Sequence, residues 1–187
     1  MLSTWKRGRA LLAERMRERL YPFDRFMNDI EAYPPQRVSG TAIFMTSNLQ
    51  GTPPTLLHNL QHNKVLHERV VLLTVVTSDV PHVPPENRTQ VDDLGQGFYR
   101  LTLRYGFMEE PDVPEALSEA AKRGFPMDLA ETTFFLGVET LLATRRPGLP
   151  LWRERLFVLI ARNALRANAF FKIPPERVVE LGMQVEL

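Results

Sequence analysis

The sequence has no cysteine and no long apolar segment. Without cysteine among the 187 residues, disulfides, thiolate metal sites, iron–sulfur clusters and cysteine nucleophiles are all excluded. A membrane-spanning helix needs about 20 mostly apolar residues, and the longest apolar runs, at residues 70–76 and 156–161, are far shorter. The N-terminus also lacks the charged, apolar and small-residue regions of a signal peptide in that order. We therefore expect a soluble, cytosolic chain.

Motifs of common enzyme classes are also missing. None of the five serines lies in a Gly-x-Ser-x-Gly turn, and there is no His-Glu-x-x-His motif. The turn at residues 48–54 is a poor phosphate loop because its prolines remove amide donors. The segment Gly95-Gln96-Gly97 lacks the third glycine of a dinucleotide fingerprint. We expect no enzymatic activity and no cofactor.

Charge is unevenly distributed along the chain. The net charge is +1, but residues 6–19 alone carry +4, which leaves −3 for the rest. This basic stretch contains Lys6, Arg7, Arg9, Arg15, Arg17 and Arg19. Such a segment could contact nucleic acid or an anionic membrane surface. Alternatively, it is an exposed helical face on which Glu14 and Glu18 pair with basic residues one turn away.

Hydrophobic periodicity divides the chain into an N-terminal arm and a body. Residues 4–20 and 23–33 have the spacing of amphipathic helices, and Pro34-Pro35 ends the second. We therefore predict a basic amphipathic arm over residues 1–35, which packs onto the body or onto another surface, and a domain over residues 36–187.

Within the body, strand and helix patterns alternate. Strands are predicted over residues 41–46, 68–77, 89–93, 98–107, 131–142 (interrupted at Gly137) and 177–187, and helices over residues 56–64, 111–124 and 151–171. The apolar run at residues 70–76 is typical of a strand covered on both faces. This alternation predicts an α/β domain with a mixed sheet and flanking helices.

The most suggestive polar cluster lies in the predicted helix at residues 56–64. His58 and His62 are four residues apart, as are Asn59 and Asn63, so each pair shares one helix face. Two imidazoles at this spacing could hold a metal ion, with His67 or Glu68 as a third ligand. The same groups could instead hydrogen-bond nearby backbone at the helix-to-strand junction, or contact a ligand or subunit. We predict no metal site and keep these four residues as ligand or interface candidates.

Several stretches of the chain resemble the Kup (KUP/HAK/KT) potassium uptake family. They are residues 4–9 (TWKRGR), 37–44 (RVSGTAIF), 54–68 (PTLLHNLQHNKVLHE), 98–109 (FYRLTLRYGFME), 133–137 (TFFLG) and 177–182 (RVVELG). The stretches occur along essentially the whole chain, and several are long. The chain thus resembles the C-terminal cytosolic domain of a bacterial member of this family.

The resemblance implies a membrane part with many helices before Met1, which carries the potassium path and the coupled proton. Lys6, Arg7 and Arg9 would then lie just inside the last span, against anionic lipid at the cytoplasmic face of the inner membrane. The domain would be a regulatory or assembly module of a potassium–proton symporter, with the membrane domain as its partner. The transport residues would lie outside this chain.

Further partners are left open by the resemblance. A homodimer is one alternative. Some bacterial members are regulated through cytosolic domains by cyclic di-AMP, so a nucleotide-sensing role is another, although no nucleotide motif matches here. We expect no nucleic-acid partner.

Overall fold

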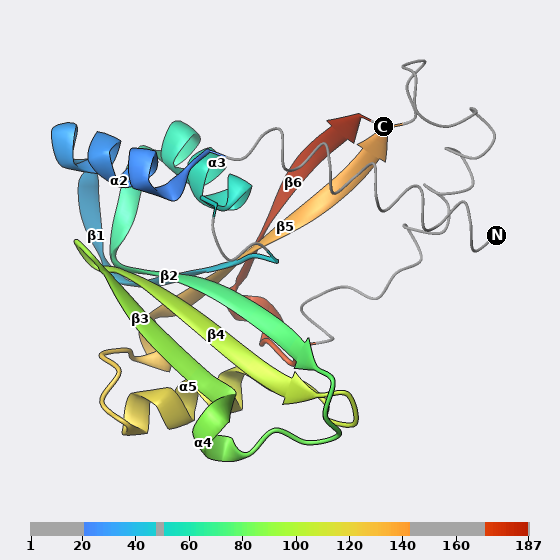
Figure 1. The fold of residues 1–187 in the computed structure, drawn as a ribbon. Helices are drawn as coiled ribbons and strands as arrows, with labels where there is room; N and C mark the ends of the chain where they lie inside the picture. The colour runs from blue at the N-terminus through green and yellow to red at the C-terminus, as the bar shows by residue number, and fades with distance from the viewer. Residues whose placement is uncertain (1–20, 48–50, 143–170, 187) are drawn as a thin grey trace.

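The computed structural model describes residues 21–47, 51–142 and 171–186. Its strands form one six-stranded mixed sheet with helices on both faces (Figure 1), which confirms the predicted fold class. In chain order the elements are α2 (Phe23–Ala32), β1 (Gln36–Met45), α3 (Pro54–Asn63), β2 (Val65–Ser78), α4 (Pro85–Arg88), β3 (Thr89–Gly95), β4 (Phe98–Gly106), α5 (Val113–Lys122), the 3-10 turn η1 (Leu129–Glu131), β5 (Thr132–Leu142), the 3-10 turn η2 (Pro175–Arg177) and β6 (Val178–Glu186).

The strand order across the sheet is β3-β4-β2-β1-β5-β6. The neighbouring pairs are parallel except β3 and β4, which form an antiparallel hairpin. Gly95, Gln96 and Gly97 connect the two hairpin strands with φ angles of 84°, 52° and 79°. The chain builds one half of the sheet with β2 and β4, then returns with β5 to the other side of β1.

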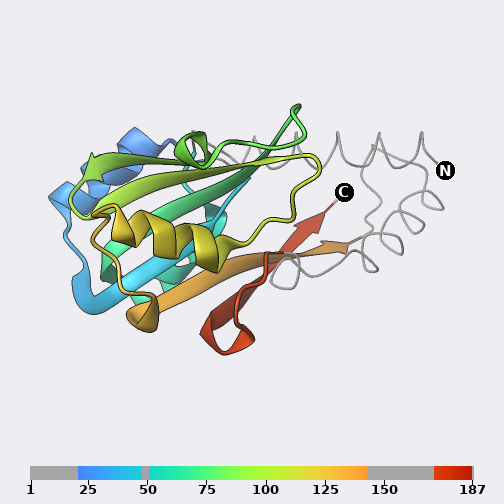
Figure 2. The same ribbon diagram turned by 90° about the horizontal axis from the view of Figure 1, so that it is seen from below.

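Two apolar clusters cover the two faces of the sheet (Figures 1 and 2). On one face, Ile43 and Leu101 of the sheet pack with Leu117 of α5. On the opposite face, Phe44 and Leu72 pack with residues of α2 and α3. Successive side chains of a strand point to opposite faces, and residues 70–73 of β2 are all buried. The prediction of a strand covered on both faces is therefore confirmed.

Helix α2, the second helix of the predicted arm, packs on the body. Phe23, Phe26 and Ile30 are buried in the cluster that contains Phe98. The rings of Phe26 and Phe98 meet edge to face, with centroids 5.7 Å apart, a favourable aromatic geometry. A boundary at residue 35 remains a proposal, and cutting there would remove three core side chains.

Two strands differ from their predicted form. β1 starts at Gln36, earlier than expected, and has an irregular register between Val38 and Thr41. β5 runs through Gly137 without a break, so the predicted interruption is wrong. Gly137 is paired with Leu181 of β6, and this neighbouring strand keeps the glycine extended. The predicted helix at residues 151–171 and the first arm helix lie outside the described residues, apart from position 171.

Candidate functional site

The predicted helix-to-strand junction is formed by α3 and β2. Pro54 occupies the first turn of α3, where the missing N–H costs no helical hydrogen bond. At the other end, Lys64 adopts the left-handed conformation with φ 57°, and its N–H donates to the carbonyl of Leu60 at 3.0 Å. This cap turns the chain directly into β2 at Val65.

Two asparagines fasten this junction. Asn59 is only 3% exposed, and its Nδ2 donates to the carbonyl of Val65 at 3.3 Å. Its Oδ1 accepts from Nδ2 of Asn63 at 2.7 Å. A buried amide left without partners would cost about 1–3 kcal/mol, so these bonds hold the end of the helix against the first residue of the strand.

The two histidines of the helix lie side by side. The ring centroids of His58 and His62 are 4.4 Å apart with a 46° tilt. His67, considered above as a third ligand, lies on β2, where its ring meets Phe135 edge to face at 6.1 Å. Within the described ranges, no group of three or more His, Asp or Glu is arranged to hold a metal. The ligand or interface role of the four junction residues stays a prediction.

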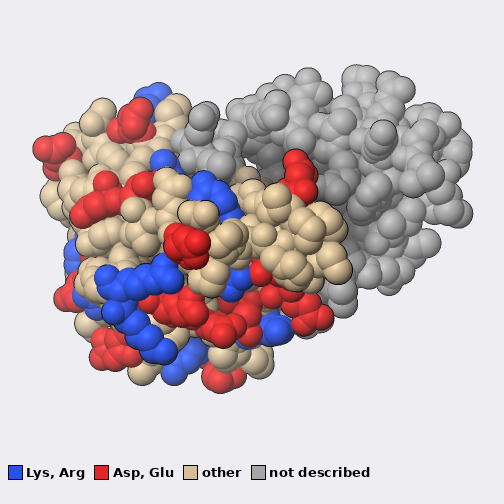
Figure 3. Space-filling model, turned by 60° about the horizontal axis from the view of Figure 1, so that its bottom comes forward, with Lys and Arg blue, Asp and Glu red and all other residues tan. Residues whose placement is uncertain are grey.

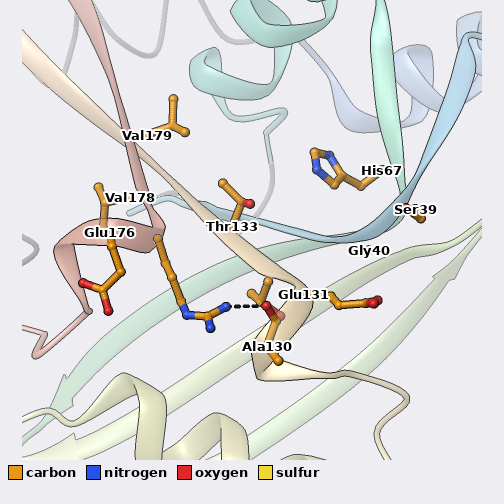
Figure 4. Close-up of a pocket in the computed structure, with 11 residues that line it drawn as sticks. Ser39, Gly40, His67, Ala130, Glu131, Thr133, Glu176, Val178 and Val179 are labelled. Carbon is orange, nitrogen blue, oxygen red and sulfur yellow. Dashed lines mark hydrogen bonds between the residues drawn. The ribbon is translucent and has the colours of Figure 1, made fainter.

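A cavity of about 610 Å³ lies at the amino ends of β1, β2, β5 and β6 (Figure 4). Its size falls within the range of small-molecule sites. Ser39 and Gly40 line it from β1, His67 from β2, and Thr133 from β5. A Cβ on Gly40 would lie 2.7 Å from the carbonyl oxygen of Glu131, so glycine permits this close approach of two chain segments.

Arg177 closes one side of the cavity. Its Nη1 donates to the carbonyl of Ala130 at 2.6 Å (Figure 4). It also donates to the carbonyl of Leu129 at 2.6 Å. These bonds fix η2 against η1 and so set the spacing between the starts of β5 and β6. The guanidinium is therefore engaged with backbone, while the nearby Glu131 and Glu176 side chains are exposed.

His67 supplies the most unusual group in the cavity wall. Its Nδ1 is enclosed and has no hydrogen-bond partner in the part of the chain that the structure describes. Burial lowers the pKa of His67, because the charged imidazolium loses hydration. The wall thus offers a neutral imidazole, two carboxylates and the hydroxyls of Ser39 and Thr133, which could hydrogen-bond a small polar ligand.

Sequence reasoning did not group these cavity residues. Glu131, Arg177 and His67 are far apart in the sequence, and the parallel strand order brings them together. A signal existed at two positions, because Glu131 and Arg177 stand immediately before apolar strands. It could not be used without knowing that β5 and β6 are neighbours.

The described surface has mixed charge on the face shown in Figure 3. Lys and Arg side chains are interspersed there with Asp and Glu side chains. Lys6, Arg7 and Arg9 of the predicted membrane contact lie outside the described residues. None of the helices within the described ranges has the length and apolar character required to span a bilayer.

Comparison with known proteins identifies the family. The family described as "K+ potassium transporter C-terminal domain" matches residues 39–187. The chain belongs to this family. This membership confirms the resemblance to potassium uptake proteins noted in the sequence.

Individual relatives match the whole chain. It is 54% identical over 187 residues to "Probable potassium transport system protein Kup 2" of Chromobacterium violaceum. It is 57% identical over 187 residues to "Probable potassium transport system protein Kup" of an Azoarcus species, and 54% identical over the same length to the protein of that name from Myxococcus xanthus. The chain spans 29–30% of the length of these relatives. No solved structure matches it significantly.

Proposed function

We propose that this chain is the cytosolic regulatory or assembly domain of a potassium–proton symporter in the bacterial inner membrane. The observation that carries the proposal is the family match over residues 39–187, together with relatives named as potassium transport proteins. Because the chain spans 29–30% of those relatives, the remainder supplies the membrane path and is the domain's first partner. The domain acts on transport from the cytoplasmic face.

Deleting residues 21–187 from the full-length transporter tests this role. Rubidium uptake by cells should continue, because the transport path lies elsewhere, but its rate and its response to cytosolic conditions should change. Membrane abundance is measured in parallel, so that a loss of protein is not read as a loss of control. Unchanged uptake, regulation and oligomeric state in the deletion would contradict the proposed role.

The basic arm is proposed to contact anionic lipid. Replacing Lys6, Arg7 and Arg9 with glutamine should lower binding of the chain to anionic vesicles without shifting its unfolding temperature. Neutral vesicles should bind weakly, because they lack the surface charge that attracts basic residues. The attraction to anionic vesicles should weaken with added salt, since it acts within a Debye length of about 8 Å at physiological salt. Binding that survives high salt would show apolar insertion instead.

A nucleotide-sensing role is a second proposal, favoured by the cavity of about 610 Å³ with the His67 side chain in its wall. Calorimetric titration with adenine nucleotides should give saturable heat that disappears in a His67→Phe variant. If no heat of binding is detected, the nucleotide-sensing role is excluded and the domain would act as a scaffold without a ligand. A homodimer also remains a proposal, and sedimentation equilibrium of the full chain tests it.

A further inference from the structure

The edge strand β6 has an open outer edge. Among the described residues, it pairs with β5 on one side, over Val178–Glu186, and with no strand on the other. Val179 is 39% exposed, and Glu180 and Gly182 are also exposed. A Cβ on Gly182 would meet nothing within 4 Å. The N–H and C=O groups along such an edge are matched best by one kind of partner, a further β-strand.

The outer part of β6 also lacks support from the rest of the sheet. β1 pairs with β5 only as far as Phe135, whereas β5 and β6 stay paired as far as Leu142 and Glu186. Beyond Phe135 the two strands leave the sheet together as a ribbon (Figures 1 and 2). An isolated pair of strands is marginally stable at best in water. No third strand of the described ranges joins this ribbon, so a strand added along β6 would stabilise it.

The opposite edge of the sheet is protected against such pairing. β3 has seven residues and carries adjacent carboxylates at Asp92 and Asp93, one for each face of the sheet. Short length, charge and proline are the means by which edge strands avoid pairing with other chains. β6 has nine residues, neither lysine nor proline, and glutamates only at positions 180 and 186. Of the two edges, β6 is therefore the one open to another strand.

We propose that β6 pairs antiparallel with β6 of a second copy of this chain, so that the two sheets join into one. Two-fold dimers are the commonest homo-oligomers, and a two-fold axis makes two identical edge strands antiparallel. When all nine residues pair, the middle residue Gly182 lies opposite its own copy, and Glu180 lies opposite Gln184 of the partner subunit. No two carboxylates then face each other directly. This inference rests on the homodimer proposed above and names its interface.

Cysteine crosslinking of the 187-residue chain tests the pairing, because the chain contains no cysteine of its own. Gly182→Cys on β6 and Val91→Cys on β3 are each treated with a short thiol-specific crosslinker. Gly182→Cys should give a covalent dimer, since the two thiols lie next to the two-fold axis. Val91→Cys, on the protected edge, should stay uncrosslinked. A covalent dimer through position 91 alone would move the interface to β3 and overturn the proposal.

A pair of matched charge variants sharpens the test. Val179 on β6 and Val91 on β3 are each 39% exposed, so lysine at either position should preserve the fold, which circular dichroism checks. Lysine on an edge strand opposes strand pairing. In sedimentation equilibrium, Val179→Lys should raise the dissociation constant of the dimer at least ten-fold, and Val91→Lys should leave it unchanged. Equal dissociation constants in the two variants would overturn the assignment of the interface to β6.

The remaining outcomes separate this pairing from the proposals on which it rests. A dimer in sedimentation that does not crosslink through position 182 keeps the homodimer but overturns the β6 interface. A chain that stays monomeric up to its highest soluble concentration overturns both. In either case, a change of rubidium uptake in the domain deletion would still support the regulatory role. If the deletion changes nothing while position 182 crosslinks, the regulatory role fails and the pairing stands.

Discussion

The two ends of the parallel strands are built differently. At the carboxyl end of β2 and β4, Oε2 of Glu109 accepts from the N–H groups of Gly106 at 2.6 Å and Val83 at 3.0 Å. The other oxygen of Glu109 pairs with Arg88 at 2.5 Å, and the guanidinium lies 5.2 Å from the ring centroid of Tyr105. At the amino end, the cavity wall instead contains His67, whose enclosed Nδ1 has no hydrogen-bond partner among the described residues.

This difference reverses the usual arrangement of an open α/β sheet. Ligands usually bind outside the carboxyl ends of the strands. Here the segment after β2 closes over the β4 end, because Phe107 and Met108 donate to the carbonyls of Val80 and Pro81 at 2.9 and 3.2 Å. The carboxyl end on this side is thus closed by hydrogen bonds, and the cavity of about 610 Å³ lies at the amino end.

Substitutions of glycine at the two ends should have the largest effects on the free energy of unfolding. A Cβ on Gly106 would lie 2.1 Å from the carbonyl oxygen of Pro81, with two more backbone atoms within 2.6 Å. Gly106→Ala should therefore lower the free energy of unfolding by about 3 kcal/mol or more, at the upper end of overpacking costs. At the amino end, Gly40→Ala should cost about 1–3 kcal/mol. Urea denaturation measures both.

The matched control for both glycines is Gly182→Ala on β6. A Cβ at this position would meet nothing within 4 Å, so stability should change by less than about 0.5 kcal/mol. If Gly40→Ala proved more costly than Gly106→Ala, the amino end would be the tighter of the two.

The asparagine at the α3–β2 junction should show the next largest effect. Asn59→Ala leaves the carbonyl of Val65 and the amide of Asn63 without their partner, so the free energy of unfolding should fall by about 1–3 kcal/mol. His58 on the same helix is half-buried and contacts the ring of His62. His58→Ala is therefore the control, and a larger loss there would contradict the assignment.

The sequence predicted the helices and strands better than the contacts between them. The continuous apolar run in β2 reflects burial of that strand on both faces. The predicted strands at residues 68–77 and 98–107 correspond to β2 and β4. The role of Asn59 was anticipated only as one of four candidates, because helical spacing cannot show which polar residue faces inward. The continuity of β5 through Gly137 depends on pairing with β6, a long-range contact that no local pattern reveals.

A pH titration should separate the two ends by their acid sensitivity. Hydrogen bonds from the backbone N–H groups of Gly106 and Val83 lower the pKa of Glu109. The stability that Glu109 contributes is therefore present above its unfolded pKa, about 4.3, and is lost as pH falls through the lower folded pKa. Glu109→Gln should lower the unfolding temperature at pH 7, with a gap that narrows below about pH 4. Glu68→Gln, at an exposed position, should show no such pattern.

The smallest expected effect lies at the amino end, in a higher pH range. Burial lowers the pKa of His67, so below its unfolded pKa of about 6.5 the unfolded chain binds a proton that the folded chain does not. The free energy of unfolding should then decrease as the pH is lowered, until the pH is below the folded pKa. His67→Phe keeps a ring beside Phe135 and removes the unpaired nitrogen, so its unfolding temperature should match or exceed that of the unsubstituted chain at pH 7. The advantage should grow between pH 6.5 and 5, in a window above that of Glu109. An advantage that stayed constant across this range would mean that His67 is solvated through the cavity and that the two ends do not differ in the way the structure indicates.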